Sequence, residues 1–434
     1  MRLELSQTAA KVFKYLLISY AVVSIVYTVS YLYTNYEGTH HDVGIIVPRA
    51  PNPQQRQQEP LIVRPPPPVE QSFGDHTVIW SHTQESAQAM SEQLLMAKVF
   101  SDALGPTVLT PYFLRAKATF DKEDISISTL VSRNRFSVLS RLATNHKGPI
   151  SAAVHINDND EKEHVLQELR ELWMTNPDMQ QYVDIHLIVD IYDRQFNMWR
   201  NVAKLFARTD YIMMLDVDFH LCTDIRKSIR NNPEWMNRLR QGRTALVVPA
   251  FEFNLQEDGE DWRTFPSNKN DLKDAVNDDK IDMFHKAWIK GHGSTNYSHW
   301  YESDDLYKVT QYDFSYEPYI IYKKEGSPWC PERFIGYGAN KAACLYEIYL
   351  SGIEYWVLPN DFLIHQTHRY PEDARRKERQ YNRKLYMNFR EEVCMRYARK
   401  FYMTGEWDTP RADNLKQECD KIHGFQRTIK STTL

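Results

Sequence analysis

The stretch "YIMMLDVDFHLC", residues 211–222, places two carboxylates, Asp216 and Asp218, at the end of an apolar strand. A charge at the end of a buried strand is costly unless a partner compensates it. Side chains two apart on a strand point to the same side, so both carboxylates can reach one ion while Val217 points into the core. The stretch therefore predicts either a cation site or a strand end whose aspartates face solvent.

Strands and helices alternate ahead of this stretch. Strands are expected at residues 124–132, 148–156 and 183–190, and each is followed by a segment with apolar residues at helical spacing. This alternation predicts an α/β fold with a Rossmann-like, mostly parallel sheet and helices on both faces. Ligands of such sheets bind at the carboxyl ends of the strands, which favours the cation site. The sequence has no glycine-rich phosphate loop, and a metal that bridges a diphosphate to carboxylates is the usual substitute.

The first 72 residues differ in composition from the rest. Residues 15–33 carry no charge over roughly 19 positions, about the length that crosses a bilayer. Basic residues precede them and acidic residues follow, so the positive-inside rule predicts a cytosolic tail at 1–14 and an uncleaved transmembrane anchor at 15–33. Residues 34–72, rich in Pro and Gln, predict an extended stalk. A cleaved signal peptide is the alternative, but its apolar region would be shorter and would end in small residues.

This order of segments is the layout of a single-pass type II membrane protein of the Golgi with a luminal catalytic domain. We expect a lead-in segment at 73–120, with a short amphipathic helix packed against the core, and the catalytic domain at 121–434. The polar tail from about residue 406 is expected to be peripheral. The layout alone does not identify an enzyme, because many surface proteins share it.

Composition narrows the class of protein further. The formal net charge of −4 lacks the basic footprint of a nucleic-acid-binding protein. Aromatic residues make up 13% of the chain, which suits surfaces that stack on sugars, although a tyrosine-rich core would explain the content equally. The five cysteines show no CxxC spacing, so a zinc knuckle is not expected. In an oxidising compartment they allow at most two disulfides and one remaining thiol, in pairs that the sequence does not assign.

Several segments in order resemble glycosyltransferase family 49. They include "WRNVAK", "FHKAWIKGHGSTNYSHW" (284–300), "ERFIGYGANKAA" (332–343) and "WVLPNDFLIHQTH" (356–368), and the resemblance spans about residues 120–405. It implies a GT-A fold, a UDP-sugar donor, Mn²⁺ as the cofactor, and a glycan or glycoprotein acceptor.

The resemblance also implies roles for particular residues. The metal would be held by Asp216, Asp218 and His365, with His368 as the nearby competitor of His365. The donor would be bound by Asp216 and by four further residues: Arg200, Asn201, Lys290 and His292. Each of these four has a structural alternative, such as a solvated helix face for Arg200. Asn296 begins a glycosylation sequon, whose use the sequence leaves open.

An inverting transfer needs a general base for the acceptor hydroxyl. Many inverting GT-A enzymes place an acidic residue just after a glycine-aromatic-glycine turn, but "GYGANK" has none. Glu317 and then Asp361 are the candidates for a catalytic base, and either of them is as readily structural. A retaining mechanism, which needs no such base, stays open. The turn itself is predicted to face the acceptor through Gly336, Tyr337, Gly338, Asn340 and Lys341.

The sequence leaves two kinds of function open. The first is a Golgi enzyme that moves a sugar from a UDP donor, for which UDP-glucuronate is favoured over UDP-N-acetylglucosamine and UDP-xylose by family analogy alone. The second is a catalytically silent Golgi partner or chaperone of an active glycosyltransferase. The sequence does not decide whether the chain forms an oligomer with itself or with another protein.

Overall fold

The computed structural model describes residues 77–80, 88–368 and 372–432, together with Ser19 and Ser24. The chain divides into two units, residues 1–72 and 73–434, and the second contains the fold. The predicted anchor at 15–33 and the predicted stalk at 34–72 thus lie almost wholly outside the described residues. Within the described part, no helix is both long enough and apolar enough to cross a bilayer.

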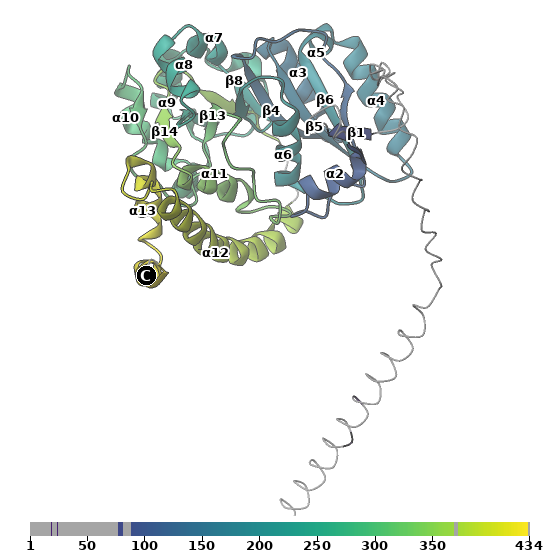
Figure 1. The fold of residues 1–434 in the computed structure, drawn as a ribbon. Helices are drawn as coiled ribbons and strands as arrows, with labels where there is room; N and C mark the ends of the chain where they lie inside the picture. The colour runs from purple at the N-terminus through teal and green to yellow at the C-terminus, as the bar shows by residue number, and fades with distance from the viewer. Residues whose placement is uncertain (1–18, 20–23, 25–76, 81–87, 369–371, 433–434) are drawn as a thin grey trace, which may run out of the picture. The chain divides into compact units, whose positions relative to one another are not determined.

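A mixed sheet organises the second unit (Figure 1). In the described residues it has nine strands, in the order β12 (Tyr307–Lys308), β14 (Glu354–Val357), β9 (Thr244–Val248), β13 (Tyr319–Lys323), β7 (Tyr211–Met214), β4 (Ile125–Ser132), β5 (Ile150–Asn157), β6 (Val183–Asp190) and β3 (Val108–Leu114). Strands β7, β4, β5 and β6 are parallel, whereas β13 runs antiparallel to both of its neighbours. The predicted α/β fold is confirmed, and the parallel part is the part that sequence alternation predicts.

Helices cover both faces of the parallel strands, as Figure 1 shows. In β5, Ala152 and Val154 belong to the core shared with α3 (Phe136–His146), α4 (Lys162–Thr175) and α5 (Pro177–Tyr182). The intervening Ala153 packs on the other face, against α6 (Phe196–Phe206). A strand buried on both faces must be apolar at consecutive positions, which is why β5 reads as a nearly continuous apolar run.

The strand order creates a switch point between β4 and β7. Strands β5 and β6 extend from one side of β4, and the chain then returns after α6 to add β7 on the other side. The residues that follow β7 include Asp216, and those that follow β4 form the turn Arg133–Arg135. Ligands of open α/β sheets bind at such a point, so the topology places the aspartates where a substrate is expected.

A second, smaller sheet lies beside the end of β7. Its four strands, in the described residues, are β11 (Ile281–Met283), β10 (Ala250–Phe253), β15 (Leu363–His365) and β8 (Phe219–Leu221). In the antiparallel pairing of β15 with β8, His365 lies opposite Phe219. The register therefore brings a residue from late in the chain next to Asp218.

Part of the predicted lead-in segment packs against the core. The segment comprises β1 (Thr77–Trp80), β2 (Gln88–Ser91) and α2 (Glu92–Val99), and the buried Phe100 that follows α2 packs with residues of α6. The sequence did not predict that β3 would extend the main sheet by pairing antiparallel with β6. The helices between β8 and β12 are α7 (Ile225–Arg230), α8 (Pro233–Arg240), α9 (Lys269–Asn277) and α10 (Tyr297–Glu302).

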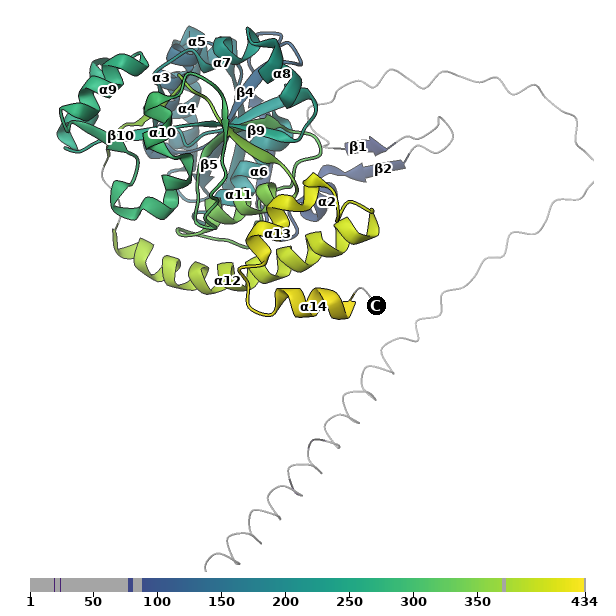
Figure 2. The same ribbon diagram turned by 90° about the vertical axis from the view of Figure 1, so that its left-hand side faces the viewer.

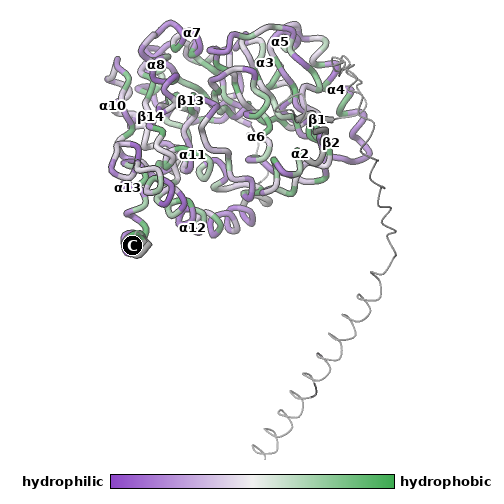
Figure 3. The backbone as a smooth tube through the Cα atoms, viewed as in Figure 1, coloured by the Kyte–Doolittle hydropathy of each residue, from purple (hydrophilic) through white to green (hydrophobic). Residues whose placement is uncertain are grey.

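The prediction of a peripheral tail is wrong. Helix α13 (Asp413–Cys419) packs against α11 (Asn340–Leu350) and α12 (Glu372–Met403), as Figure 2 shows, and Leu415 and Cys419 are fully buried. The final helix is α14 (Phe425–Thr432). The segment is polar overall, but its buried apolar residues face the core and cover α12. The rest of the α12 surface is largely hydrophilic (Figure 3).

Two disulfides stabilise this C-terminal part. They join Cys330 to Cys344 and Cys394 to Cys419, and Cys222 is a buried free thiol. The expectation of two disulfides and one remaining thiol is confirmed, and the structure supplies the pairs.

We predict that Cys419→Ser lowers the free energy of unfolding by roughly 2–4 kcal/mol, because the disulfide that closes this loop restricts the unfolded chain. Chemical denaturation of the oxidised protein measures the change. The control is Cys222→Ala, which removes a buried thiol without opening a crosslink and should cost about 1 kcal/mol. An equal effect of the two substitutions would contradict a structural role for the crosslink between α12 and α13.

Candidate functional site

Asp216 lies at the switch point among cationic and phenolic groups. Its Oδ2 accepts hydrogen bonds from Lys341 Nζ and from the Tyr319 hydroxyl, each at 3.0 Å, and Arg200 Nη2 lies 3.4 Å from its Oδ1. Burial acts to raise the pKa of Asp216, but Lys341 and Arg200 outweigh burial and hold the pKa well below its usual range. Asp216 is therefore a fixed anion that gathers two cations.

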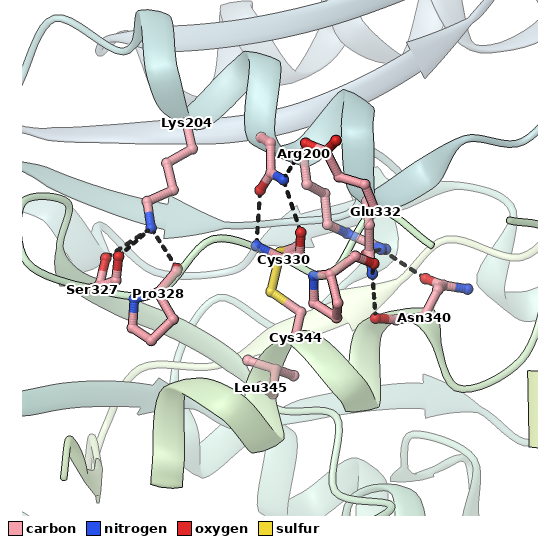
Figure 4. Close-up of a disulfide and its surroundings, with 12 residues drawn as sticks. Arg200, Lys204, Ser327, Pro328, Cys330, Glu332, Asn340, Cys344 and Leu345 are labelled. Carbon is pink, nitrogen blue, oxygen red and sulfur yellow. Dashed lines mark hydrogen bonds between the residues drawn. A yellow bond between two sulfur atoms is a disulfide. The ribbon is translucent and has the colours of Figure 1, made fainter. Parts of the chain in front are cut away.

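The cation Arg200 is positioned by a polar stripe on α6. The stripe consists of side chains at helical spacing, all of them buried and all donating to residues 327–340: Asn197, Arg200, Asn201 and Lys204 (Figure 4). Buried polar groups must find partners, and here the partners are the carbonyls and side chains of this one loop. Helix α6 thus fixes the path of the loop that precedes Lys341.

Asn340 connects the stripe to the aspartate. Its Oδ1 accepts from Arg200 Nη1 at 2.7 Å, and its backbone carbonyl accepts from Asn197 Nδ2 at 2.9 Å. Lys341 is the next residue, the second position of α11, and its ammonium lies 3.4 Å from the centre of the Tyr319 ring as well as on Asp216. Asn340 and Lys341 thus lie on the Asp216 side of the site, and their predicted acceptor-side role stays a prediction.

The predicted donor-binding role of Asn201 does not fit its contacts. Its side-chain amide donates to Cys330 O at 2.8 Å and to Glu332 Oε1 at 2.6 Å, and its carbonyl accepts from the Cys330 N–H. Farther along the stripe, Lys204 donates to Ser327 and Pro328. Asn201 and Lys204 therefore belong to the scaffold around the Cys330–Cys344 disulfide and not to the group around Asp216.

Asp218 is held by residues from two distant segments. Arg135 Nε lies 2.7 Å from its Oδ1, and His368 Nε2 lies 3.3 Å from its Oδ2. Burial acts to raise the pKa of Asp218, whereas His368 and Arg135 lower it, and the net shift is downward. His365 is buried beside Asp218, and burial lowers the pKa of His365 to about 3, so its imidazole is neutral at physiological pH.

The predicted metal ligands Asp216, Asp218 and His365 thus lie on neighbouring elements of the fold. Among the described residues, no group of three or more His, Cys, Asp or Glu side chains is gathered closely enough to hold a metal ion as it stands. The carboxylates are instead turned toward cations of the chain, Asp216 toward Lys341 and Asp218 toward Arg135. Two carboxylates and a neutral imidazole on adjacent elements are nonetheless a donor set that suits Mn²⁺.

The segment "WIKGHG" contributes one of its two predicted donor residues to this centre. His292 is buried, and burial together with the nearby Lys341 and His285 holds the pKa of His292 well below its usual range. Lys290 is exposed on the turn Lys286–Gly291, and none of the described contacts of Asp216 or Asp218 involves it. The structure therefore supports a position in the site for His292 and not for Lys290.

The two candidate bases lie in different surroundings. Glu317 is half-buried; burial raises its pKa, and Lys341 and Arg200 oppose that shift, so its carboxyl lies near both cations. Asp361 is only 2% exposed, and its carboxylate accepts from Thr223 Oγ1 at 2.6 Å and Ser228 Oγ at 3.2 Å. These contacts make Asp361 a structural residue that ties a loop to α7, and the structure leaves Glu317 as the candidate.

The glycine-tyrosine-glycine turn packs against α12. Gly336 has a φ of +85°, and a Cβ there would lie 2.6 Å from Glu378 Cδ, so only glycine fits this close approach. The same holds at Gly338, where a Cβ would lie 3.0 Å from Arg379 Cα. The Tyr337 N–H donates to Glu378 Oε2 at 2.9 Å, and its ring packs on Phe196. The turn thus packs against α12, and its predicted acceptor-side role stays a prediction.

Two residues of the site were missed from the sequence. Arg135 follows the strand β4 directly, and its position was recoverable, because residues just past neighbouring parallel strands meet at one edge of the sheet. Tyr319 lies in the antiparallel strand β13, whose place beside β7 no local pattern in the sequence indicates. Its hydroxyl reaches Asp216 only because of that pairing.

The chain is similar in sequence to known glycosyltransferases. A family model described as "Glycosyl-transferase for dystroglycan" matches residues 124–195 and 191–398. The mouse xylosyl- and glucuronyltransferase LARGE1 is 28% identical over 315 residues, which are 68% of this chain and 39% of that protein. The mouse LARGE2 is 31% identical over 250 residues, which are 56% of this chain and 34% of that protein. The chain thus spans well under half the length of these relatives.

Among solved structures, the chain is similar to GalNAc-T7 with UDP, GalNAc and Mn²⁺, with 12% identity, a TM-score of 0.35, and coverage of 71% of this chain and 55% of that one. The two stretches of the family match cover well over half of the chain. The chain therefore belongs to this glycosyltransferase family, family 49, as its motifs indicate.

Proposed function

We propose that the chain is a Golgi type II membrane enzyme that transfers glucuronic acid from UDP-glucuronate to a glycan acceptor, with Mn²⁺ as cofactor and inversion at the anomeric carbon. The observation that carries the proposal is the convergence of Arg200, Lys341 and Tyr319 on Asp216, beside Asp218 and His365. A charged centre of this kind at a switch point is a site for an anionic ligand bound with a metal.

The metal would be held by Asp216, Asp218 and His365. When bound, it would supply positive charge to the diphosphate of the donor. The chain itself contributes Lys341 and Arg200, which lie on the same carboxylate and carry fixed positive charge at the place where the leaving diphosphate develops negative charge. Because α6 and the loop 327–340 hold both cations, little reorganisation is needed when the donor binds.

Glu317 is the proposed general base. As the acceptor oxygen bonds to the anomeric carbon, the bond from that carbon to the diphosphate breaks, UDP leaves with the electron pair, and the hydroxyl proton passes to the Glu317 carboxylate. A raised carboxyl pKa suits this role, since it makes the carboxylate a better proton acceptor.

The choice of glucuronate follows from the relatives, which are named xylosyl- and glucuronyltransferases. The cations around Asp216 and Asp218 also provide partners for a uronate carboxylate. The Golgi membrane location follows from the uncharged segment at 15–33 and the stalk that succeeds it. The second candidate function, a catalytically silent partner of an active enzyme, is disfavoured by the intact set of Asp216, Asp218 and His365.

We predict that Asp216→Asn reduces UDP release from UDP-glucuronate by about 100-fold or more. The substitution removes a proposed metal ligand, and it removes the anion that orders Lys341 and Arg200. The assay compares the full-length variant and wild type in detergent, with Mn²⁺ and with EDTA, across UDP-glucuronate, UDP-xylose and UDP-N-acetylglucosamine. Thermal unfolding checks that the variant is folded, since the buried Lys341 would lose its charged partner. Background release by wild type with every donor would favour the silent partner.

We predict that Glu317→Gln abolishes transfer to p-nitrophenyl glycosides while UDP binding, measured by calorimetry, stays within about twofold of wild type. Transfer by wild type should fall as the pH drops through the pKa of Glu317, which lies above its usual range, because protonation removes the base.

The matched control for this carboxylate is Asp361→Asn. It should lower the melting temperature by loosening the contacts to Thr223 and Ser228, and leave the pH dependence of transfer unchanged. If Glu317→Gln transfers sugar at the wild-type rate, a different group acts as the base.

A further inference from the structure

Residues 284–292 connect the two sides of the site. At one end, the Phe284 ring lies 4.9 Å from the ring of His365 and 5.1 Å from that of His292. At the other end, the Gly291 carbonyl accepts the N–H of Glu317 at 2.8 Å. This segment therefore runs from a predicted metal ligand to the proposed base and forms one wall of the site.

Two large apolar side chains are exposed on this wall. Trp288 is 49% exposed and Ile289 is 65% exposed. Each packs back onto a nearby glycine: a Cβ at Gly291 would lie 3.1 Å from Trp288 Cε3, and a Cβ at Gly293, just after the wall, would lie 2.7 Å from Ile289 Cγ1. Adjacent exposed apolar side chains next to a polar centre are typical of a ligand surface.

The backbone of the wall is fixed in place. The His285 N–H donates to Glu252 Oε1 at 2.7 Å, and the Trp288 N–H donates to the His285 carbonyl at 2.8 Å. Trp288 itself has a non-helical backbone, φ −128° and ψ 71°, inside the turn Lys286–Gly291. The kink lies at a residue whose indole is exposed and whose backbone neighbours are hydrogen-bonded. Binding of a ligand to the indole therefore costs little conformational entropy of the loop.

We propose that Trp288 and Ile289 form the acceptor subsite, on which the apolar face of a sugar ring stacks while its hydroxyl approaches Glu317. The inference rests on the proposed function and names the acceptor side of the same site. An indole offers a large, rigid apolar surface at low entropic cost, which suits the C–H face of a pyranose. The charged diphosphate of UDP needs the cations near Asp216 and not this apolar pair.

The test compares Trp288→Ala and Trp288→Phe with a matched control, Trp329→Ala. Trp329 is equally exposed, at 48%, but lies 4.5 Å from the ammonium of Lys204 in the disulfide scaffold. Full-length protein in detergent is assayed for transfer to p-nitrophenyl glycosides of xylose, glucuronic acid and N-acetylglucosamine. UDP release without an acceptor reports the donor side separately.

For Trp288→Ala we expect the acceptor KM to rise about tenfold or more, while the donor KM and acceptor-free UDP release stay within about twofold of wild type. Trp288→Phe keeps an aromatic face and should recover most of the affinity, and Trp329→Ala should resemble wild type.

An unchanged acceptor KM in Trp288→Ala, with normal acceptor-free UDP release, overturns the subsite and leaves the proposed function intact. A change in oligomeric state in light scattering, without a change in KM, assigns the pair to a protein interface and also overturns it. Absence of UDP release from wild type with all donors removes the proposed function, and the acceptor subsite with it.

Discussion

The compensation of one carboxylate governs this structure. Asp216 follows the strand at the centre of the sheet, where an uncompensated charge would be unfavourable. Lys341 and Arg200 satisfy it, and both of these cations are buried, so neither of them tolerates the loss of Asp216. The position of the site therefore depends on charge pairing as much as on apolar packing.

That pairing imposes order on segments far apart in the chain. Lys341 reaches Asp216 only if the loop before α11 follows one path, and the buried polar stripe of α6 fixes this path through Asn340. The Cys330–Cys344 disulfide joins the same loop to α11. On the outer side, α12 holds the loop through Asn382, which donates to the carbonyls of Ile335 and Tyr337. Scaffold and site are thus one hydrogen-bonded unit.

The chemistry assigned to the site follows from how its charges are divided. Negative charge is concentrated at the switch point and is surrounded by cations, whereas Glu317 lies at the edge of this group, close to the wall formed by residues 284–292. An anionic donor and a neutral sugar acceptor can then occupy different sides of one centre. The imidazoles of His292 and His365 stay neutral because they are buried, so they add ligands or packing without adding charge.

The sequence by itself determined the α/β class, the position of Asp216 and Asp218 at a strand end, and the upper limit of two disulfides, because these depend on local periodicity, spacing and composition. Motif resemblance added His365 and Arg200, and the lack of a carboxylate in the glycine turn made Glu317 a candidate base. Only the tertiary structure decided that Asn201 and Asp361 contact the scaffold, that the turn at Gly336 packs on α12, that Tyr319 and Arg135 lie beside the aspartates, and that α13 completes the core. Those outcomes depend on which distant strands and helices become neighbours, and local patterns do not encode that.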